Sequence, residues 1–225
     1  MNIIPSRSVA VVAELSCNHQ GSLARAHALV DAAADAGATA IKIQTWAPDK
    51  MVLDQGYVLE DGPWKGRNLA ELYREAWTPW DWHQSIFEHA RTRGIQAFTS
   101  VFDLESLEWL ERTFDLPAYK VASFELVDLQ LIRAIAKTGK PIILSTGMAS
   151  QTEIREAWSS AVAAGANDIT VLRCTSTYPA GAEHANLRTM QHMARDMSVR
   201  PGLSDHTPGI GVALAAAALG ARMIE

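Results

Sequence analysis

The stretch AYKVASFELVDLQLIRAIAKTGKPIILSTG, residues 118–147, contains the unit that decides the fold. An apolar run of strand length at 118–124 is followed by Asp128, which can cap a helix, and by Gly139, which stands where a helix ends. A second apolar run, at 141–147, comes directly after. The order strand, helix, strand predicts a parallel βαβ unit.

The same unit recurs in both directions along the chain. Apolar runs of strand length lie at 8–14, 38–44, 95–101, 118–124, 141–147 and 168–174, with weaker ones at 201–205 and 221–225. Eight strands that alternate with helices predict closure into a (βα)8 TIM barrel rather than an open doubly wound sheet. No GxGxxG fingerprint opens the first helix, which also counts against a dinucleotide fold.

Helix boundaries are marked by capping residues. The helix from Ser22 to Gly37 carries Leu23, Ala26, Val30 and Ala33 on one face, as a helix on a sheet does. The other markers are the N-caps Asp103, Asp128 and Ser150, the starts at Thr78-Pro79 with Asp81 and at Thr207-Pro208, and the glycines Gly37, Gly94, Gly139, Gly165 and Gly220.

One connection is longer than the others. Residues 47–77 follow the second predicted strand and contain Trp64 and Trp77 with several Gly and Pro. We expect a folded loop over the barrel mouth rather than a linker. The neighbouring stretch WTPWDWH has helical spacing, so packing of its tryptophans against the barrel is favoured over stacking on a sugar ring.

Composition limits the classes of function. The 225 residues, 48% hydrophobic and 20% charged, suffice for one sizeable core, so we expect residues 1–225 to form one domain. A net charge of -5 gives no basic footprint for nucleic acid or an anionic membrane. The sequence has neither a signal-type N-terminus nor an apolar run long enough to span a bilayer.

The cysteines indicate a reducing compartment. Cys17 and Cys174 lie far apart in the sequence and form no CxxC motif or disulfide framework. We expect both to be small buried residues and the protein to be cytoplasmic.

The chain ends at Glu225, inside the eighth predicted strand. A barrel without an eighth helix has a gap in its outer ring. We therefore expect either a fragment, truncated within the eighth strand, or a barrel whose gap another polypeptide covers.

Polar residues gather at the carboxyl ends of the predicted strands, where a TIM barrel has its active site. Two lysines in otherwise apolar strands are costly to bury unless each meets an anion, and with a ring of hydroxyls they suit a phosphate and a carboxylate together. Taken singly, each lysine can instead pair with a structural Glu. The strand-end residues are Glu14, Lys42, Gln44, Thr99, Ser100, Lys120, Ser123, Glu125, Ser145, Thr146, Ser176, Tyr178, Ser204, Asp205, His206 and Glu225.

His206 is the candidate metal ligand or base, although a lone histidine is more often a hydrogen-bonded structural residue. Glu14 and Glu225 are candidates for further ligands, directly or through water. Asn18 and His19 either line the same mouth or form an ordinary helix-entry loop.

Six motifs carry a family resemblance. AELSCNHQGS, AIKIQTW, YKVASFE, IILSTGMAS, CTSTYPA and GLSDHTPGIG resemble the successive motifs of the sialic acid synthases, in order and over nearly the whole chain. PWKGRNLAELYREAWTPWDWH, TWAPDKM and CTSTYPA resemble the branch that forms pseudaminic acid more than the N-acetylneuraminate branch. The resemblance implies that phosphoenolpyruvate condenses with an open-chain acetamido sugar, with a divalent metal (Mn²⁺ or Mg²⁺) and release of phosphate.

The resemblance also implies roles for the strand-end residues. His206 binds the metal, while the catalytic residues Glu14 and Glu225 position water and move protons. The residues implied for phosphoenolpyruvate are Lys42, Thr99, Lys120, Ser123, Ser145, Ser176 and Ser204, and those for the sugar are Gln44, Glu125 and Tyr178. The sugar implied by the branch is 2,4-diacetamido-2,4,6-trideoxy-L-altrose, and a homodimer is the implied assembly.

The sequence departs from the family pattern in four places. The pattern continues beyond Glu225 with Lys-His-Phe, whose His is the second metal ligand, and then with an antifreeze-like (SAF) domain that reaches the partner's sugar site. We therefore expect weaker metal and sugar binding by this chain alone. Val101 stands where Pro is usual, and Ser176 stands where neuraminate synthases commonly have Asn.

Two other functions compete with this interpretation. One is a Schiff-base aldolase that uses Lys42 or Lys120, although neighbouring hydroxyls and amides favour the protonated amine. The other is an inactive truncated barrel that only binds ligand.

Overall fold

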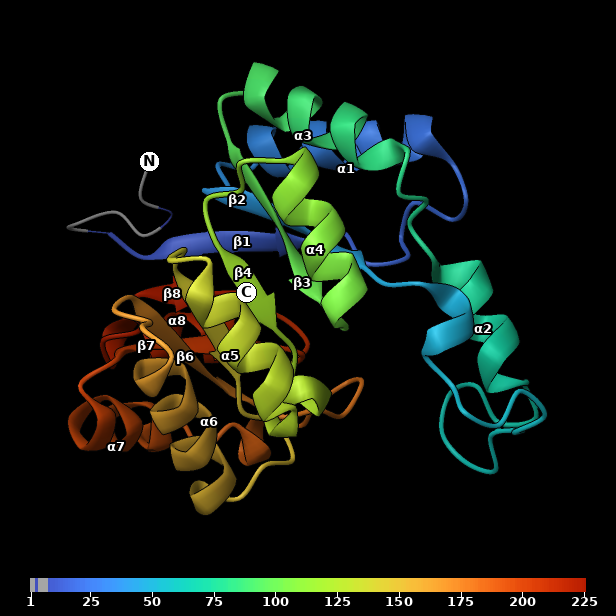
Figure 1. Ribbon diagram of the computed structural model, residues 1–225. Helices are drawn as coiled ribbons and strands as arrows, with labels where there is room; N and C mark the ends of the chain where they lie inside the picture. The colour runs from blue at the N-terminus through green and yellow to red at the C-terminus, as the bar shows by residue number, and fades with distance from the viewer. Residues whose placement is uncertain (1–2, 4–7) are drawn as a thin grey trace.

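Eight parallel strands close into a barrel in the computed structural model, which describes residue 3 and residues 8–225 (Figure 1). Each strand pairs with the next along the chain, and β8 pairs with β1. The strands are β1 (Ala10–Glu14), β2 (Ala40–Thr45), β3 (Gln96–Val101), β4 (Tyr119–Val121), β5 (Ile142–Ser145), β6 (Ile169–Cys174), β7 (Arg200–Ser204) and β8 (Met223–Ile224). The predicted TIM barrel is confirmed.

Helices surround this barrel and connect its strands (Figure 1). The α-helices are α1 (Leu23–Asp35), α2 (Leu69–Ala76), α3 (Trp82–Thr92), α4 (Leu104–Thr113), α5 (Leu129–Lys137), α6 (Gln151–Ala163), α7 (Arg188–Met197) and α8 (Gly211–Ala218). Short 3-10 helices are η1 (Pro48–Lys50), η2 (Phe124–Val127) and η3 (Ala182–His184). Strand β4 is shorter than predicted because the chain turns into η2 directly after it.

Most of the predicted helix ends are confirmed. The side chains of Asp103, Asp128 and Ser150 accept backbone N–H groups at the starts of α4, α5 and α6. The predicted start at Thr207-Pro208 is too early, because α8 begins at Gly211. At the C-terminal ends, Gly37 has φ +82° and Gly165 has φ +105°, a left-handed conformation that side chains rarely adopt.

Two apolar layers follow from the alternation of side chains along each strand. One cluster draws on seven strands or their first residues, so it fills the inside of the barrel: Ile3, Ala10, Val12, Ala40, Phe98, Ala118, Ile143, Leu172 and Met223. Residues at the alternate positions, such as Val121, Leu144 and Val171, pack against helices in a separate cluster.

Residues 47–77 form a lobe rather than a cover over the mouth. Figure 1 shows this segment, with α2, standing out from the barrel beyond the end of β2. The ring of Tyr73 in α2 packs edge-on against Trp46, and Lys50 forms an ion pair with Glu105 of α4. Because the mouth residues Phe124 and Tyr178 are 65% and 55% exposed, the lobe leaves that rim open.

The tryptophans of WTPWDWH pack against the barrel layer, as predicted. Trp80 stacks on Trp109 of α4 with ring centroids 4.6 Å apart, and Trp82 packs on the cluster beneath α1 and α3. Trp64, in the same lobe, is half exposed.

Cys174 is buried as predicted, but the prediction for Cys17 is wrong, because it is exposed in the loop after β1. Both are free thiols. Within the part of the chain that the structure describes, no helix is long and apolar enough to cross a membrane.

Candidate active site

The inner face of the barrel changes from apolar to polar toward the carboxyl ends of its strands. Side chains two positions apart on a strand share a face, so each residue two places after an interior apolar residue lies directly above it. The residues selected in this way are Glu14, Lys42, Ser100, Lys120, Ser145, Cys174 and Glu225. The sequence thus places a polar layer directly above the apolar cluster that fills the inside of the barrel.

Two lysines and two carboxylates meet in this layer. Lys42 forms an ion pair with Glu14 and lies 3.7 Å from Glu225 Oε1. Lys120 Nζ lies 3.5 Å from the same oxygen of Glu225. Ser204 Oγ donates to that oxygen at 3.4 Å, and Lys42 donates to Ser100 Oγ at 2.9 Å. Strands from opposite sides of the barrel therefore contribute to one charged cluster.

The charges in this cluster shift one another's pKa values. Burial lowers the pKa of Lys42 to about 8; Glu225 opposes this shift and Lys120 adds to it. Burial alone would raise the pKa of Glu225, but Lys120 and Lys42 outweigh it and hold that pKa below the ordinary value. Glu225 is thus a carboxylate held between two ammonium groups.

Several buried polar atoms of the mouth have no hydrogen-bond partner among the described residues. They are Ser145 Oγ, Glu125 Oε2 and Glu225 Oε2. Buried polar groups are nearly always paired, so three unpaired atoms in one concavity mark a place where a ligand supplies the partners.

A second group of small hydroxyls lies where the β5 loop closes on β4 and β6. The Gly147 N–H donates to Ser123 Oγ at 3.1 Å, and a Cβ at Gly147 would collide with Ser176 Oγ. Only glycine allows this approach. The structure therefore brings together Ser123 and Ser176, two residues that the sequence predicted to bind an anion.

His206 lies at the rim of the mouth with its ring orientation fixed. Its Nδ1 donates to the Thr175 carbonyl at 2.9 Å and lies 4.0 Å from Cys174 Sγ, while Tyr178 packs on its ring at 4.2 Å. Burial alone would lower the pKa of His206, but Cys174 and the Thr175 carbonyl outweigh it and raise that pKa. The arrangement leaves Nε2 for a ligand.

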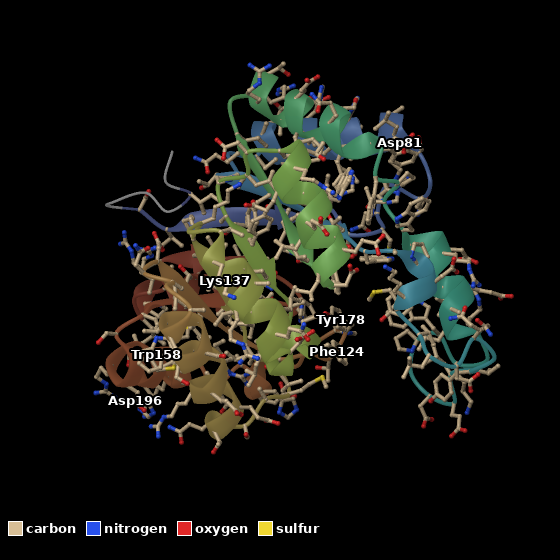
Figure 2. All side chains as sticks on the ribbon, in the orientation of Figure 1. Asp81, Phe124, Lys137, Trp158, Tyr178 and Asp196 are labelled. Atoms are coloured by element: carbon tan, nitrogen blue, oxygen red, sulfur yellow. The ribbon has the colours of Figure 1, made fainter. Side chains whose placement is uncertain are left out.

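Glu125, in η2 after β4, is the titratable group on the side of the mouth toward the lobe. Burial raises the pKa of Glu125 to about 7, against the attraction of Lys120. Burial and the charge of Glu125 raise the pKa of Tyr73, so the lobe helix α2 reaches the vicinity of this carboxyl group. Figure 2 shows Phe124 and Tyr178 projecting from the same end of the barrel.

Thr99 is the predicted ligand that the structure places away from the mouth. It points outward from β3, where its hydroxyl lies 2.7 Å from Thr45 Oγ1, and Thr45 Oγ1 lies 2.8 Å from His83 Nε2. His83 Nδ1 donates to the Pro79 carbonyl at 3.1 Å. Thr99 therefore belongs to a buried network beneath α3, and Ser100 occupies the mouth position on β3.

His19 is also a structural residue rather than part of the mouth. Its Nδ1 accepts the Gly21 N–H at 3.1 Å and its Nε2 lies 3.1 Å from Thr78 Oγ1. Both ring nitrogens are thus used to join the loop after β1 to the segment before α3.

Cys174 and Tyr73 were not selected from the sequence as residues of the site, and Ser100 was named among the strand-end residues without a role in binding substrate. Ser100 follows from period-2 alternation once the bulky Phe98 is placed inside the barrel. Cys174 gave no signal beyond its small apolar character, and Tyr73 lies in a lobe whose docking on Trp46 is a tertiary contact.

Comparison with known proteins gives a consistent result. A family model described as the NeuB family matches residues 29–225. The chain is 44% identical to a pseudaminic acid synthase of Campylobacter jejuni subsp. jejuni serotype O:2, covering 100% of this chain and 66% of that protein. It is 43% identical to a pseudaminic acid synthase of Helicobacter pylori, covering 96% of this chain and 64% of that protein.

A solved structure agrees with these relatives. The N-acetylneuraminic acid (sialic acid) synthetase from Leptospira borgpetersenii, in complex with citrate, superimposes with a TM-score of 0.88 at 30% identity. The alignment covers 97% of this chain and 72% of that structure.

Proposed function

The chain belongs to the NeuB family, and on that premise we propose that it condenses phosphoenolpyruvate with an open-chain acetamido sugar and water. The products are a nonulosonic acid and inorganic phosphate. The names of the two synthases from Campylobacter jejuni and Helicobacter pylori support pseudaminic acid as the product and 2,4-diacetamido-2,4,6-trideoxy-L-altrose as the sugar. The alternative sugars are those of N-acetylneuraminic and legionaminic acid synthesis.

The observation that carries the proposal is the approach of Lys42 and Lys120 to one buried oxygen of Glu225, at 3.7 and 3.5 Å. Two ammonium groups over an apolar barrel floor form a site for a compact anion with several negative charges. Phosphoenolpyruvate carries a phosphate and a carboxylate, which two lysines can receive separately. The hydroxyls of Ser100, Ser123, Ser145, Ser176 and Ser204 supply the neutral donors around them.

The carboxylates of the mouth serve the proton transfers. Glu14 accepts the Ser16 N–H at 2.8 Å and pairs with Lys42, so it is fixed in place to orient a water molecule. Glu225 is held ionised between the lysines and can accept a proton from that water. Glu125, with its pKa near 7, can donate a proton to the oxygen that develops charge on the sugar aldehyde.

The sugar lies on the open side of the mouth in this proposal. Gln44 continues the inner face of β2 above Lys42, and Tyr178 is half exposed beside His206. Together with Glu125 they line the approach to the anion cradle from the lobe side. A polar inner layer and an exposed aromatic rim suit a ligand with a charged head and a hydroxylated body.

His206 fits a divalent metal by its hydrogen bonding. A metal-bound histidine commonly donates its other ring N–H to a carbonyl, as His206 Nδ1 does to Thr175. Nowhere in the described part of the chain does a group of three or more His, Cys, Asp or Glu side chains stand ready to hold a metal ion, so His206 would be a single ligand from this barrel. When bound, Mn²⁺ or Mg²⁺ would act as a Lewis acid on the aldehyde oxygen.

One observation favours the Schiff-base aldolase as a second candidate, namely the pKa of about 8 for Lys42. Its ion pair with Glu14 and its hydrogen bond to Ser100 stabilise the ammonium form, which argues for an anion-binding role instead. Borohydride treatment in the presence of sugar decides between them, because only a Schiff base leaves a covalent adduct on Lys42.

The function is tested by phosphate release from phosphoenolpyruvate with Mn²⁺. Three sugars are compared: the 2,4-diacetamido-trideoxy-altrose, its legionaminic counterpart and N-acetylmannosamine. Release with the first alone supports the pseudaminic assignment, and release with another reassigns the sugar. Light scattering on the same samples tests the proposed homodimer.

A further inference from the structure

A cavity of about 410 Å³ lies between α6 and α7, on the outer side of β6. It is separate from the barrel mouth, because its lining residues Thr146 and Arg173 are the sequence neighbours of Ser145 and Cys174, whose side chains face the barrel interior. Adjacent residues on a strand point to opposite faces. The two compartments therefore share the sheet as a wall.

The inner wall of the cavity is apolar and its edge is polar. Ile154 of α6 and Met193 and Met197 of α7 line it and belong to the cluster under the helices. At the edge, Arg155 donates to Asp196 at 2.8 Å, which joins α6 to α7 and neutralises both charges. Figure 2 shows Asp196 beside α7, on the opposite side of the view from Tyr178 and Phe124.

Arg173 is the unusual residue of this cavity. Other outward positions, such as Val171 on β6 itself and Leu144 on the neighbouring β5, carry apolar side chains, whereas Arg173 places a guanidinium on this face. Its Nη2 donates to Thr175 Oγ1 at 3.2 Å and to the His184 carbonyl at 3.1 Å. Among the described residues, Nε and Nη1 have no hydrogen-bond partner, and no carboxylate lies within ion-pair distance of the guanidinium.

Charged groups at such positions normally have a counter-ion. Burial lowers the pKa of Arg173, yet a guanidinium stays protonated in proteins. A half-buried cation with three free N–H donors loses hydration that no protein group replaces. A planar, bidentate acceptor, namely a carboxylate or a phosphate, is the chemical partner that fits those donors.

We propose that the cavity between α6 and α7 binds a small organic anion, a molecule with one phosphate or carboxylate group on an apolar body. The anionic group lies on Arg173, and the body lies against Ile154, Met193 and Met197. The volume is within the range of roughly 300–1,000 Å³ that is usual for small-molecule sites. The site is distinct from the phosphoenolpyruvate cradle and does not depend on the proposed reaction.

Methyl NMR of the 225-residue chain, labelled at Met and Ile, tests the proposal. The probes are phenyl phosphate, benzoate and the neutral benzyl alcohol. We expect saturable shifts of the Met193, Met197 and Ile154 methyls with at least one anionic probe, and binding of benzyl alcohol at least about tenfold weaker. The comparison of phenyl phosphate with benzoate decides which anionic group the site prefers.

Met223, inside the barrel directly beneath Glu225, reports separately on the barrel mouth. Shifts confined to Met223 would assign the anion to the mouth and overturn the proposal, as would the absence of any saturable shift. Phosphoenolpyruvate is expected to shift Met223, so a failure of the proposed reaction appears at a different methyl from a failure of this site.

Variants complete the test. Arg173→Gln should weaken binding of the anionic probe by about tenfold or more, while Arg195→Gln, on the same side of the sheet in α7 but outside the cavity, should not. Equal affinity in Arg173→Gln and the native chain would overturn the proposal. If Arg173→Gln does not fold, Arg173→Lys, which keeps the charge but loses the bidentate contact, should bind more weakly than the native chain.

Discussion

Lys120 of β4 and Glu225, the residue after β8, meet across the barrel, with Nζ 3.5 Å from Oε1. Strands β4 and β8 are separated by three strands on either side, so this ion pair crosses the interior rather than following the sheet. A carboxylate of the chain therefore lies between the two lysines, at the place where we propose that a substrate anion binds.

Replacement of Lys120 by Ala should weaken the binding of phosphoenolpyruvate and destabilise the fold. The substitution removes one of the two ammonium groups and leaves the buried charge of Glu225 with one counter-ion fewer. Breaking a buried ion pair in this way typically lowers the free energy of unfolding by about 3–5 kcal/mol. Calorimetry should give a dissociation constant raised by about tenfold or more. Lys137→Ala, on the exposed face of α5, is the control, and unchanged binding in Lys120→Ala would contradict the cradle.

Ser100 and Thr99 should differ in what they affect, although they are neighbours. Ser100→Ala should raise the phosphoenolpyruvate concentration for half-saturation, because Ser100 faces the mouth beside Lys42. Thr99→Val should leave that concentration unchanged and lower the free energy of unfolding by about 1–3 kcal/mol, since Thr45 loses a buried partner. Urea denaturation and substrate titration of both variants separate the two effects, and the opposite pattern would restore Thr99 to the site.

His83 should make stability depend on pH. Burial lowers the pKa of His83 to about 4 from an ordinary 6.5, so the unfolded chain binds a proton between these values that the folded chain does not. Neutral His83 therefore contributes fully to the free energy of unfolding above pH 6.5. This contribution is lost as the pH falls from 6.5 toward 4, so the free energy of unfolding should decrease by about 2 kcal/mol between pH 7 and pH 5. Chemical denaturation at both values should show this difference in the native chain and a smaller one in His83→Gln.

His206→Ala should abolish the metal dependence of phosphate release in an active form of the protein without unfolding it. Loss of a metal ligand that stabilises a developing alkoxide should reduce turnover by about a hundredfold or more. His184→Ala, in the exposed η3 segment, is the matched control. A native rate in His206→Ala, with the same response to Mn²⁺, would remove the metal role from this residue.

The fold was predictable because local signals agree with the tertiary arrangement. The apolar runs, Asp128 and Ser150 as caps, and the glycines at the helix ends each report a short-range preference that the barrel keeps. The lobe at 47–77 was recognised as an insertion, but its position was predicted wrongly. Its placement depends on Tyr73 and Trp46, which are 27 positions apart and have no local pattern in common.

The candidate site was predictable in its residue types and less so in its geometry. Lys42 and Lys120 stand out as lone charges in apolar strands, and the structure brings both to Glu225. The sequence prediction gave the binding role to Thr99 and not to Ser100. Both are hydroxyl residues, and resemblance to a motif does not state which of the two faces the barrel interior. Arg173 was not recognised for a related reason. A charged residue near the end of a strand can face either the mouth or the helices, and only the alternation of side chains along that strand decides which.

The two-layer interior has a consequence for how such chains tolerate insertions and deletions. The removal of one residue from β4 before Lys120 would turn the lysine toward the helices and bring Val121 into the mouth, so only one alignment of each strand keeps its polar residues in the mouth. An insertion or deletion in the lobe leaves the inward and outward alternation of side chains unchanged in every strand. Natural variation in length among related barrels should therefore collect in segments such as 47–77 and be absent within the strands.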